Sequence, residues 1–250
     1  MTASESDALH CTIPADMSPC APRGIEETTQ LDKQYRVCAR LSLGLPLLSS
    51  DHQLPADCPL CKKGENAVAN DPWHWLVCKS QSKREIDTRH NAVKDALYRA
   101  VLLTGGQAVR EVRGLQAGSD LRPDLQIVYP GRHVLTDVAV VHPGAYARAG
   151  PENSTATAKK MQAEKRKKYA TIARRHDAEL IPFVVETSGG LEEDAIALLD
   201  VISGAASEHL SIWSQEDAAK EVLNSVAIAV QKGNAMTVLG AHAAALLRAA

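Results

Sequence analysis

Four side chains have the types and spacing of a zinc site, in the pattern Cys58-x2-Cys61-x12-His74-x3-Cys78. Structural zinc takes four thiolate or imidazole ligands in a tetrahedron. The Cys-x2-Cys turn aims two sulfur atoms at one point, and His-x3-Cys places two ligands one helical turn apart. Four protein ligands leave no open coordination position, so we expect a structural Zn²⁺. The alternative is that these are unrelated cysteines and a surface histidine.

Two aspartates form a second group that could hold a cation. Asp124 follows Arg122-Pro123 at the start of one predicted strand, and Asp137 lies in the next. The Pro130-Gly131 turn between them predicts a hairpin that places Asp124 opposite Asp137. Two carboxylates so close repel each other unless a cation lies between them. Mg²⁺ there would polarise a phosphate and lower the pKa of its bound water. An isolated aspartate pair on a hairpin is more often an ordinary turn or strand-edge feature, which is the alternative.

Hydrolysis of a phosphodiester also needs a positive group near the developing charge. The common (D/E)-x-K motif would place a lysine at position 139, where this chain has Ala139. Lys165 and Lys168 lie three residues apart on a predicted helix and share one face. We expect one of them to supply the charge, with Lys165 favoured. The alternatives are a solvated basic face and phosphate contacts without catalysis.

The elements that would position these residues follow from the apolar periodicity. We predict helices at Gln34–Leu48, Ser82–Leu103, Ala158–His176, Leu191–Ala206 and His209–Val230, with a further helix or a frayed end from Ala235. We predict strands at Ala108–Val112, Asp124–Tyr129, His133–Val141 and Leu180–Glu186. A helix between the last two strands implies a crossover, so the final strand should be parallel to a neighbour. The prediction is an α/β fold with a mixed four-stranded sheet flanked by helices.

Charge is distributed unevenly along the chain. The net charge is only −2, yet residues 159–175 contain eight Lys or Arg and one Glu, and residues 186–221 contain nine Asp or Glu and one Lys. A basic helix beside acidic ones suggests a polyanionic partner, although a solvated helix would show the same pattern. No secretory signal and no membrane-spanning apolar run is visible.

The cysteines are therefore more typical of metal ligands or free thiols than of disulfides. Cys11, Cys20 and Cys38 have no ligand-like spacing and are assigned no role. Trp73 and Trp75 flank His74 and are expected to pack around the metal, with base stacking as the alternative.

Seven sequence blocks, in order, resemble the restriction-like endonuclease domain at the C-terminal end of site-specific non-LTR retrotransposon proteins. The resemblance covers about Gln34 to Asp200. The blocks are Arg40-Leu-Ser-Leu-Gly-Leu-Pro46, the Cys58–Cys78 knuckle, Arg89-His90-Asn91, Arg122-Pro123-Asp124, Asp137-Val138, Ala163-Glu-Lys-Arg-Lys-Lys-Tyr169, and Pro182-Phe-Val-Val-Glu-Thr187 with Gly189-Gly190.

The resemblance implies a PD-(D/E)XK-like fold and an enzyme that nicks target DNA, so that the free 3′ end primes reverse transcription. It implies that Asp124 and Asp137 hold Mg²⁺ and that Lys165 or Lys168 supplies the cation. Glu186 would touch the metal or support the site, and Tyr169 would support the site. DNA-contacting residues are expected at Arg89, His90, Asn91, Arg122, Lys159, Lys160, Lys167, Arg174 and Arg175. The expected partners are DNA, element RNA and a polymerase acting in trans, in the nucleus.

The chain departs from this family because nothing in it resembles the upstream polymerase. We expect a fragment or a domesticated remnant in which activity could be lost. The expected organisation is a disordered lead-in (1–33), a helix with the zinc knuckle (34–81), the endonuclease domain (82–207) and a helical extension (208–250). Three hypotheses stand: a Mg²⁺-dependent endonuclease, a catalytically inactive DNA-binding module, and an α/β protein whose knuckle serves stability or a protein contact.

Overall fold

The computed structural model describes residues 25–43, 45, 58, 60–61, 73–78, 80, 83–118, 120–143, 156–209 and 214–249. The chain divides into two compact units, 1–33 and 34–250. Among the described residues, the first unit contains only the start of helix α1 (Ile25–Ser42), and all other elements belong to the second. Helix α1 begins at Ile25, inside the segment predicted to be disordered. Cys11, Cys20 and most of that segment lie outside the described residues.

The sheet is mixed, as predicted. Strands β1 (Gln107–Arg110), β2 (Leu125–Tyr129) and β3 (Arg132–Thr136) pair antiparallel, and β5 (Glu179–Leu180) pairs parallel to β3. Strand β4 (Val138–Val141) pairs parallel to β6 (Phe183–Glu186). The strand order is β1-β2-β3-β5, with β4-β6 beside it.

Two predicted strands are each interrupted once. The strand predicted at His133–Val141 divides into β3 and β4 at Asp137, and the one predicted at Leu180–Glu186 divides before Phe183. Val134 pairs with Glu179 and Val138 with Phe183, so the offset is 45 residues on both sides of the break (179 − 134 and 183 − 138). At this offset Pro182 stands opposite Asp137. Proline has no amide hydrogen to donate, which explains the break in the strand. The pairing register is the same on both sides of the break.

The β2–β3 hairpin has the predicted register. Leu125 pairs with Thr136 and Tyr129 with Arg132 across a turn in which Gly131 has a φ of +71°. Side chains alternate between the faces of a sheet. Asp124 and Asp137 directly flank the pair Leu125–Thr136, at the end of the hairpin away from the turn.

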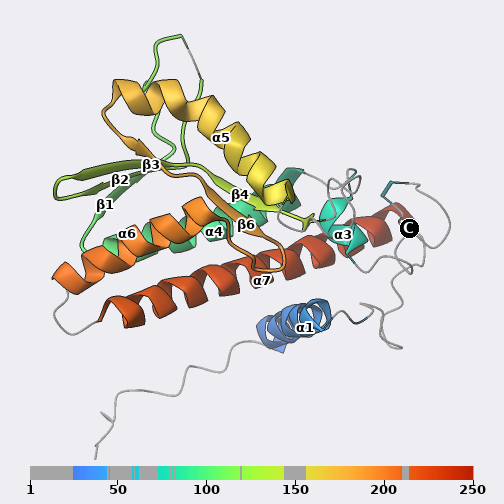
Figure 1. Ribbon diagram of the computed structural model, residues 1–250. Coiled ribbons are helices and arrows are strands. Elements are labelled where there is room, and N and C mark those ends of the chain that lie inside the picture. Colours follow the sequence, from blue (N-terminus) through green and yellow to red (C-terminus); the bar gives the residue numbers. More distant parts are fainter. Residues whose placement is uncertain are drawn as a thin grey trace, which may run out of the picture. The chain divides into compact units, whose positions relative to one another are not determined.

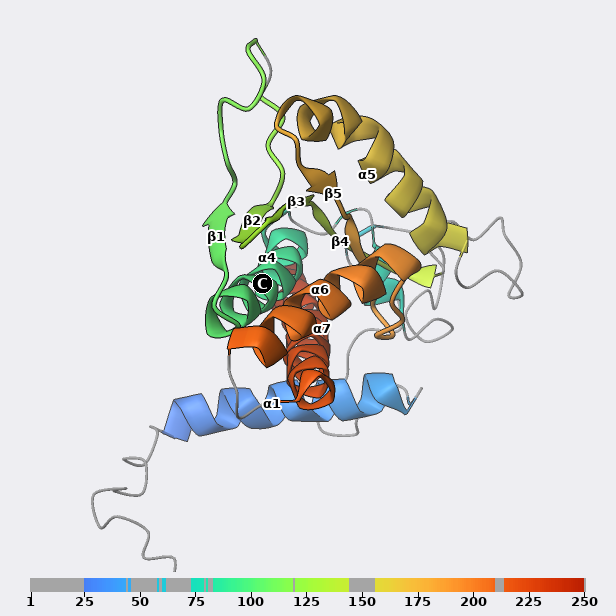
Figure 2. The same ribbon diagram turned by 60° about the vertical axis from the view of Figure 1, so that its left-hand side comes forward.

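Helices cover both faces of the sheet. Helices α4 (Lys83–Leu103), α6 (Glu193–His209) and α7 (Gln215–Ala249) lie on one face, and α5 (Ala156–Arg175) lies on the other (Figures 1 and 2). The main core joins α4, α6 and α7 to the sheet and includes Leu97, Phe183 and Ile202. Smaller clusters beneath α5 contain Leu135, Tyr169, Ile172 and Val184.

Helix α7 continues without interruption to Ala249, where we had predicted one helix ending near Val230 and a separate tail. Its buried positions recur every three or four residues, at Val222, Val226, Val230, Asn234, Val238 and Ala241. One face therefore packs along its whole length, and packing stabilises helices more than propensity does. None of the described helices is long and apolar enough to cross a membrane.

Candidate active site and zinc centre

The predicted zinc ligands come together. One donor atom from each of Cys58, Cys61, His74 and Cys78 lies within 4.8 Å of all the others. The Cys58 and Cys78 Sγ atoms are 3.7 Å apart, and Cys61 Sγ lies 3.3 Å from His74 Nε2. Tetrahedral zinc would separate two sulfurs by about 3.8 Å and a sulfur and a nitrogen by about 3.6 Å. The four side chains therefore fit a structural Zn²⁺.

The zinc cluster is embedded in a small core of its own. His74 begins the four-residue helix α3 (His74–Val77), and Cys78 follows it in extended conformation. Trp75 is fully buried and packs with Leu41 of α1 and Val238 of α7, which agrees with packing rather than base stacking. Burial first, and then the neighbouring thiols, raise the pKa of Cys78 to about 12. A bound cation would favour the thiolate form.

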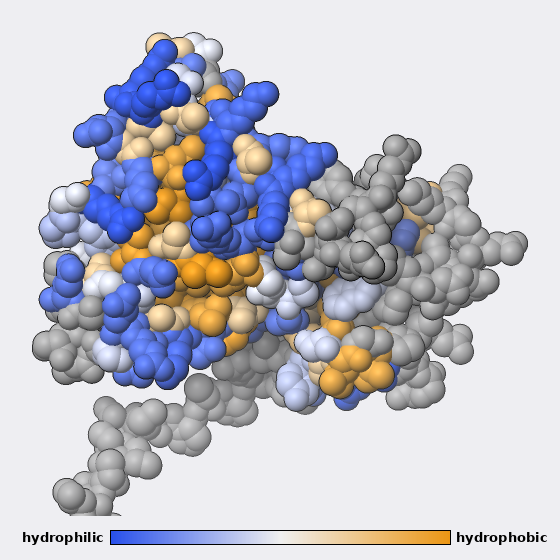
Figure 3. All heavy atoms as spheres, viewed as in Figure 1, coloured by the Kyte–Doolittle hydropathy of each residue, from blue (hydrophilic) through white to orange (hydrophobic). Residues whose placement is uncertain are grey.

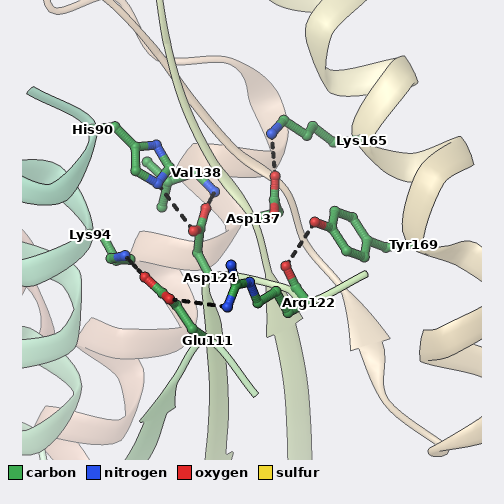
Figure 4. Close-up of polar contacts among 9 residues, drawn as sticks. All are labelled: His90, Lys94, Glu111, Arg122, Asp124, Asp137, Val138, Lys165 and Tyr169. Atoms are coloured by element: carbon green, nitrogen blue, oxygen red, sulfur yellow. Dashed lines mark hydrogen bonds and ion pairs between the residues drawn. The ribbon is translucent and has the colours of Figure 1, made fainter. Parts of the chain in front are cut away.

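A polar cavity of about 330 Å³ lies where α4, α5 and the β2–β3 hairpin meet. Figure 4 shows His90 and Lys94 reaching in from α4 and Lys165 and Tyr169 from α5, with the aspartates between them. The lining residues are His90, Lys94, Glu111, Asp120, Leu121, Arg122, Asp124, Asp137, Lys165, Lys168 and Tyr169. The hairpin thus brings both predicted carboxylates to one cavity, and α5 adds both predicted lysines.

Asp137 is the more deeply buried carboxylate, with 4% of its surface exposed. Lys165 forms an ion pair with it from the facing turn of α5. One turn further along α5, the Tyr169 hydroxyl donates a hydrogen bond to the Arg122 carbonyl at 2.9 Å. Burial, together with the negative charge of Asp137, raises the pKa of Tyr169, which therefore stays protonated as a donor. Helix α5 is thereby fixed over the aspartates.

Asp124 has two partners of different kinds. Its Oδ1 lies 3.1 Å from His90 Nε2, and its Oδ2 accepts a 2.7 Å hydrogen bond from the Val138 amide. Burial alone would raise the pKa of Asp124, but these contacts outweigh burial and lower it. The sequence predicted a DNA contact for His90, and the structure adds a carboxylate partner within the protein. Helical periodicity cannot reveal a partner 34 residues away in the sequence.

Lys94 and Glu111 are cavity residues that the sequence analysis missed. Lys94 Nζ donates to Glu111 Oε1 at 2.6 Å, and Arg122 approaches the other carboxylate oxygen at 3.9 Å. These cations, Lys94 above all, lower the pKa of Glu111. Glu111 has a left-handed φ of +49°, so β1 ends at Arg110 although we predicted it to reach Val112. No sequence signal marks this conformation, because glutamate rarely adopts it.

Two predicted site residues lie elsewhere. Arg89 is 6% exposed and packs against α7, where it donates to Asn234 Oδ1 at 3.4 Å. Burial lowers its pKa to about 10. This interior position does not fit the DNA contact predicted for Arg89. Glu186 is buried in β6 and accepts a hydrogen bond from Ser188 at 3.0 Å, away from the cavity lining, so it is not in position to touch a metal there.

The remaining predicted DNA-contacting residues are on the surface. Asn91 on α4 is exposed, and Arg122 lines the cavity with its side chain 45% exposed. The five α5 residues predicted to contact DNA are all exposed: Lys159, Lys160, Lys167, Arg174 and Arg175. Arg166, which was not singled out from the sequence, instead pairs with Asp194 at the start of α6. That pair attaches α5 to the helix layer across the sheet edge.

A larger cavity of about 790 Å³ lies between α4 and α7. Its lining is mostly apolar, with residues such as Leu103, Ile228 and Met236. Neither predicted metal-binding aspartate borders it, and the convergent charged groups belong to the smaller cavity. The smaller cavity is therefore the candidate site, although it is not the larger of the two.

No protein-family model matches the sequence, and no curated protein matches it. The chain is therefore characterised by its mixed α/β fold, its long C-terminal helix and a Cys3His cluster suited to zinc.

Proposed function

We propose that this protein is a Mg²⁺-dependent DNA endonuclease that hydrolyses a phosphodiester in the cavity beneath α5. The observation that carries the proposal is the convergence of Asp124, Asp137 and Lys165 on one polar cavity. Buried carboxylates beside a lysine form a site suited to metal-assisted phosphoryl chemistry. The third of our hypotheses, an α/β protein whose knuckle serves stability or a protein contact, gives no reason for this convergence.

The charges around the cavity favour a divalent ion. Four cationic side chains, Lys94, Arg122, Lys165 and Lys168, balance four carboxylates, Glu111, Asp120, Asp124 and Asp137. The lining is therefore neutral by itself, and one divalent ion would make it attractive to a phosphate anion. Asp124 and Asp137 are the residues that would hold the ion, since both line this cavity. When bound, Mg²⁺ supplies Lewis acidity and an acidified water.

The remaining side chains have separable roles in this proposal. Lys165 is placed to stabilise negative charge on the phosphate as the bond breaks. His90 orients Asp124 through the 3.1 Å contact. Lys94 and Arg122 hold Glu111 at the rim, which limits its repulsion of a phosphate. Tyr169 holds the β1–β2 connection, which carries Arg122, against α5.

DNA would lie along α5. Figure 3 shows hydrophilic side chains over this helix and an apolar patch below it, over α6. The exposed lysines and arginines of α5 can neutralise backbone phosphates and so supply affinity without sequence readout. One phosphate of the bound strand would then lie in the cavity beneath α5, next to Asp137 and Lys165.

The resemblance to the restriction-like endonuclease domain of site-specific non-LTR retrotransposon proteins gives this activity a context. In that context the nick exposes a 3′ hydroxyl that primes reverse transcription by a polymerase acting in trans, in the nucleus. Element RNA would be a further partner. Asp124, Asp137 and Lys165 stand at the positions of the chain that match the family pattern.

The decisive experiment is conversion of supercoiled plasmid to the nicked form with Mg²⁺ and with EDTA. We expect nicking only with Mg²⁺. Asp137→Asn should abolish it and leave DNA affinity within about twofold, because the phosphate contacts come from α5. Asp200→Asn is the matched control, since Asp200 is an exposed carboxylate on α6. Equal nicking by Asp137→Asn and the wild type would refute the assignment.

A DNA-binding module without catalysis is the second candidate. It is favoured by the pairing of both carboxylates within the protein, Asp137 with Lys165 and Asp124 with His90. Under this alternative the wild type binds DNA but nicks none with Mg²⁺ or Mn²⁺. Asp137→Asn would then leave all DNA-dependent measurements unchanged.

A further inference from the structure

A second cavity adjoins the first on the side of the β1–β2 connection. Its volume is about 300 Å³, and it is lined by Arg113, Gly114, Asp120, Leu121 and Arg122. Asp120, Leu121 and Arg122 also line the cavity that holds the two aspartates. The two cavities therefore share a wall. We call the second one the Arg113 cavity.

The segment that forms the Arg113 cavity is held by contacts at both ends and in the middle. The Glu111 amide donates a hydrogen bond to the Asp124 carbonyl at 2.9 Å, which joins the two ends of the segment. The Tyr169 hydroxyl holds the Arg122 carbonyl, and the ring of His176, just after α5, contacts the Leu115 carbonyl at 2.7 Å. The backbone that carries both arginines is thus fixed to α5, the helix that carries Lys165.

Apolar packing adds to this attachment. Leu115 and Leu121 pack against Tyr169 and Ile172 on the buried side of α5. Gly114 and Gly118 have φ values of +77° and +71°, a conformation that other residues adopt at a cost. The bends in this connection therefore agree with its sequence, and the backbone that carries the arginines is held in place before any ligand arrives.

The electrostatics of the Arg113 cavity favour an anion. Its lining holds two arginines and one aspartate, for a net charge of +1. Among the residues that the structure describes, no carboxylate lies within ion-pair distance of Arg113, and Arg122 has only the 3.9 Å contact with Glu111. A guanidinium donates paired hydrogen bonds that match two phosphate oxygens. The charged groups of this cavity are therefore largely uncompensated, unlike those of its neighbour.

We propose that the Arg113 cavity binds the DNA phosphate next to the scissile one, with Arg113 and Arg122 as its ligands. The inference rests on the proposed endonuclease function and deepens it by assigning a second phosphate position. Sharing one wall, the two cavities can take successive phosphates of one strand. Arg113 lies outside the reacting cavity, so it strengthens substrate binding and leaves the chemical step to Lys165 and the aspartates.

The test compares Arg113→Gln with the wild type and with Arg99→Gln. Arg99 is an exposed arginine on α4 that borders the apolar cavity, so its replacement removes the same charge elsewhere. Duplex DNA binding is measured in Ca²⁺ between dilute and physiological salt. Arg113→Gln should weaken binding by roughly tenfold and reduce the salt slope by about 0.9, the value for one phosphate. Arg113→Lys should recover most of the slope. Arg99→Gln should change neither quantity.

Kinetics and a small-anion titration complete the test. In nicking assays Arg113→Gln should raise KM and keep kcat within about twofold, whereas loss of kcat with unchanged KM overturns the binding role. Titration with inorganic phosphate tests whether the anion bound at Arg113 is free phosphate or a phosphate of the DNA backbone. Phosphate binding that depends on Arg113, with DNA affinity that does not, would also overturn the proposal.

The outcomes also separate this inference from the proposed function. An unchanged salt slope in a variant of an enzyme that nicks plasmid rejects the Arg113 site alone. A reduced slope in a protein that does not nick rejects the endonuclease function and keeps the phosphate site. Thermal unfolding of each variant must match the wild type, which excludes a folding defect as the cause.

Discussion

Among single residues, the ion pair between Asp137 and Lys165 bears most directly on the proposed chemistry. The Asp137 side chain is 5% exposed and that of Lys165 is 19% exposed. Such a pair gains little relative to an apolar pair, but removing one partner leaves the other charge buried and uncompensated. Lys168 borders the same cavity, and its Nζ lies 4.6 Å from the centre of the Tyr169 ring, so its charge has a different environment.

Lys165→Met and Lys168→Met should therefore differ. We expect Lys165→Met to lower the nicking rate by on the order of 10²-fold to 10³-fold, the usual effect of losing a group that stabilises developing charge. Lys168→Met should cost less than about tenfold. Plasmid-nicking rates at saturating DNA measure the difference. A larger loss in Lys168→Met would move the catalytic role to that residue.

Lys165→Met should also lower stability by about 3 kcal/mol in urea unfolding without metal, because Asp137 loses its partner. Added Mg²⁺ should recover part of this loss, since a bound cation replaces the lost charge. A loss that Mg²⁺ does not change would argue against an ion at Asp137.

At the scale of elements, α4 and α7 approach closely where Arg89 crosses Gly233. A Cβ at Gly233 would lie 2.7 Å from Arg89 Cγ and 2.9 Å from its Cα. Next to this glycine, the Asn234 side chain accepts a hydrogen bond from Arg89 through its Oδ1. Its Nδ2 donates a hydrogen bond to the Thr187 carbonyl at 2.8 Å. This interlock sets the position of α4 on the sheet, and His90 and Lys94 project from the same helix into the cavity.

Gly233→Ala should be destabilising by about 1–3 kcal/mol, because backbone atoms of α4 must move. Gly204→Ala on α6 is the control: its Cβ would meet only Gln215 Nε2, at 3.9 Å. That change should be neutral or stabilising by up to about 1 kcal/mol through helix propensity. Urea unfolding of both variants decides the question, and equal stabilities would contradict the close approach.

Helix α5 combines an inward face for the cavity with an outward basic face. Replacing Lys159, Lys160, Arg174 and Arg175 with glutamine should flatten the salt dependence of DNA binding. The slope should fall by up to about 3.6 if each residue neutralises one phosphate at about 0.9 per phosphate. Filter binding across a salt series measures it. An unchanged slope would place the DNA elsewhere.

At the scale of the whole molecule, α7 joins two cores. Val222, Val226 and Val230 belong to the sheet core, whereas Val238 and Ala241 belong to the core around the zinc ligands. The zinc core also holds Leu41 of α1. Because these cores share few elements, loss of metal should loosen one without unfolding the other.

Removing zinc with a chelator, or by Cys61→Ser, should increase hydrogen exchange in α3, the end of α7 and residues 34–42. Exchange in β2 and β3 should stay near the wild-type level. Fluorescence of the buried Trp75 should shift to longer wavelength as water reaches it. In the chelated wild type, zinc but not Mg²⁺ should restore both signals. Purified protein that holds no zinc, or exchange that rises uniformly, would contradict this arrangement.

The sequence by itself determined the features that depend on neighbours along the chain. The Pro130-Gly131 turn and the alternation of β2 and β3 set the register of the hairpin. Ligand spacing predicted the Cys3His cluster, and a helix between two strands predicted their parallel pairing. Each is a short-range consequence of backbone geometry, and each prediction was confirmed.

Only the tertiary structure decided which side chains meet across elements. Periodicity tells which face of a helix is buried, but it does not tell what lies opposite, so the pairing of His90 with Asp124 had no sequence signal. For the same reason Arg89 was predicted to contact DNA but lies against α7, and Lys94 was not singled out although it contacts Glu111. These contacts depend on how helices dock on the sheet, which is decided by packing of the whole core rather than by local pattern.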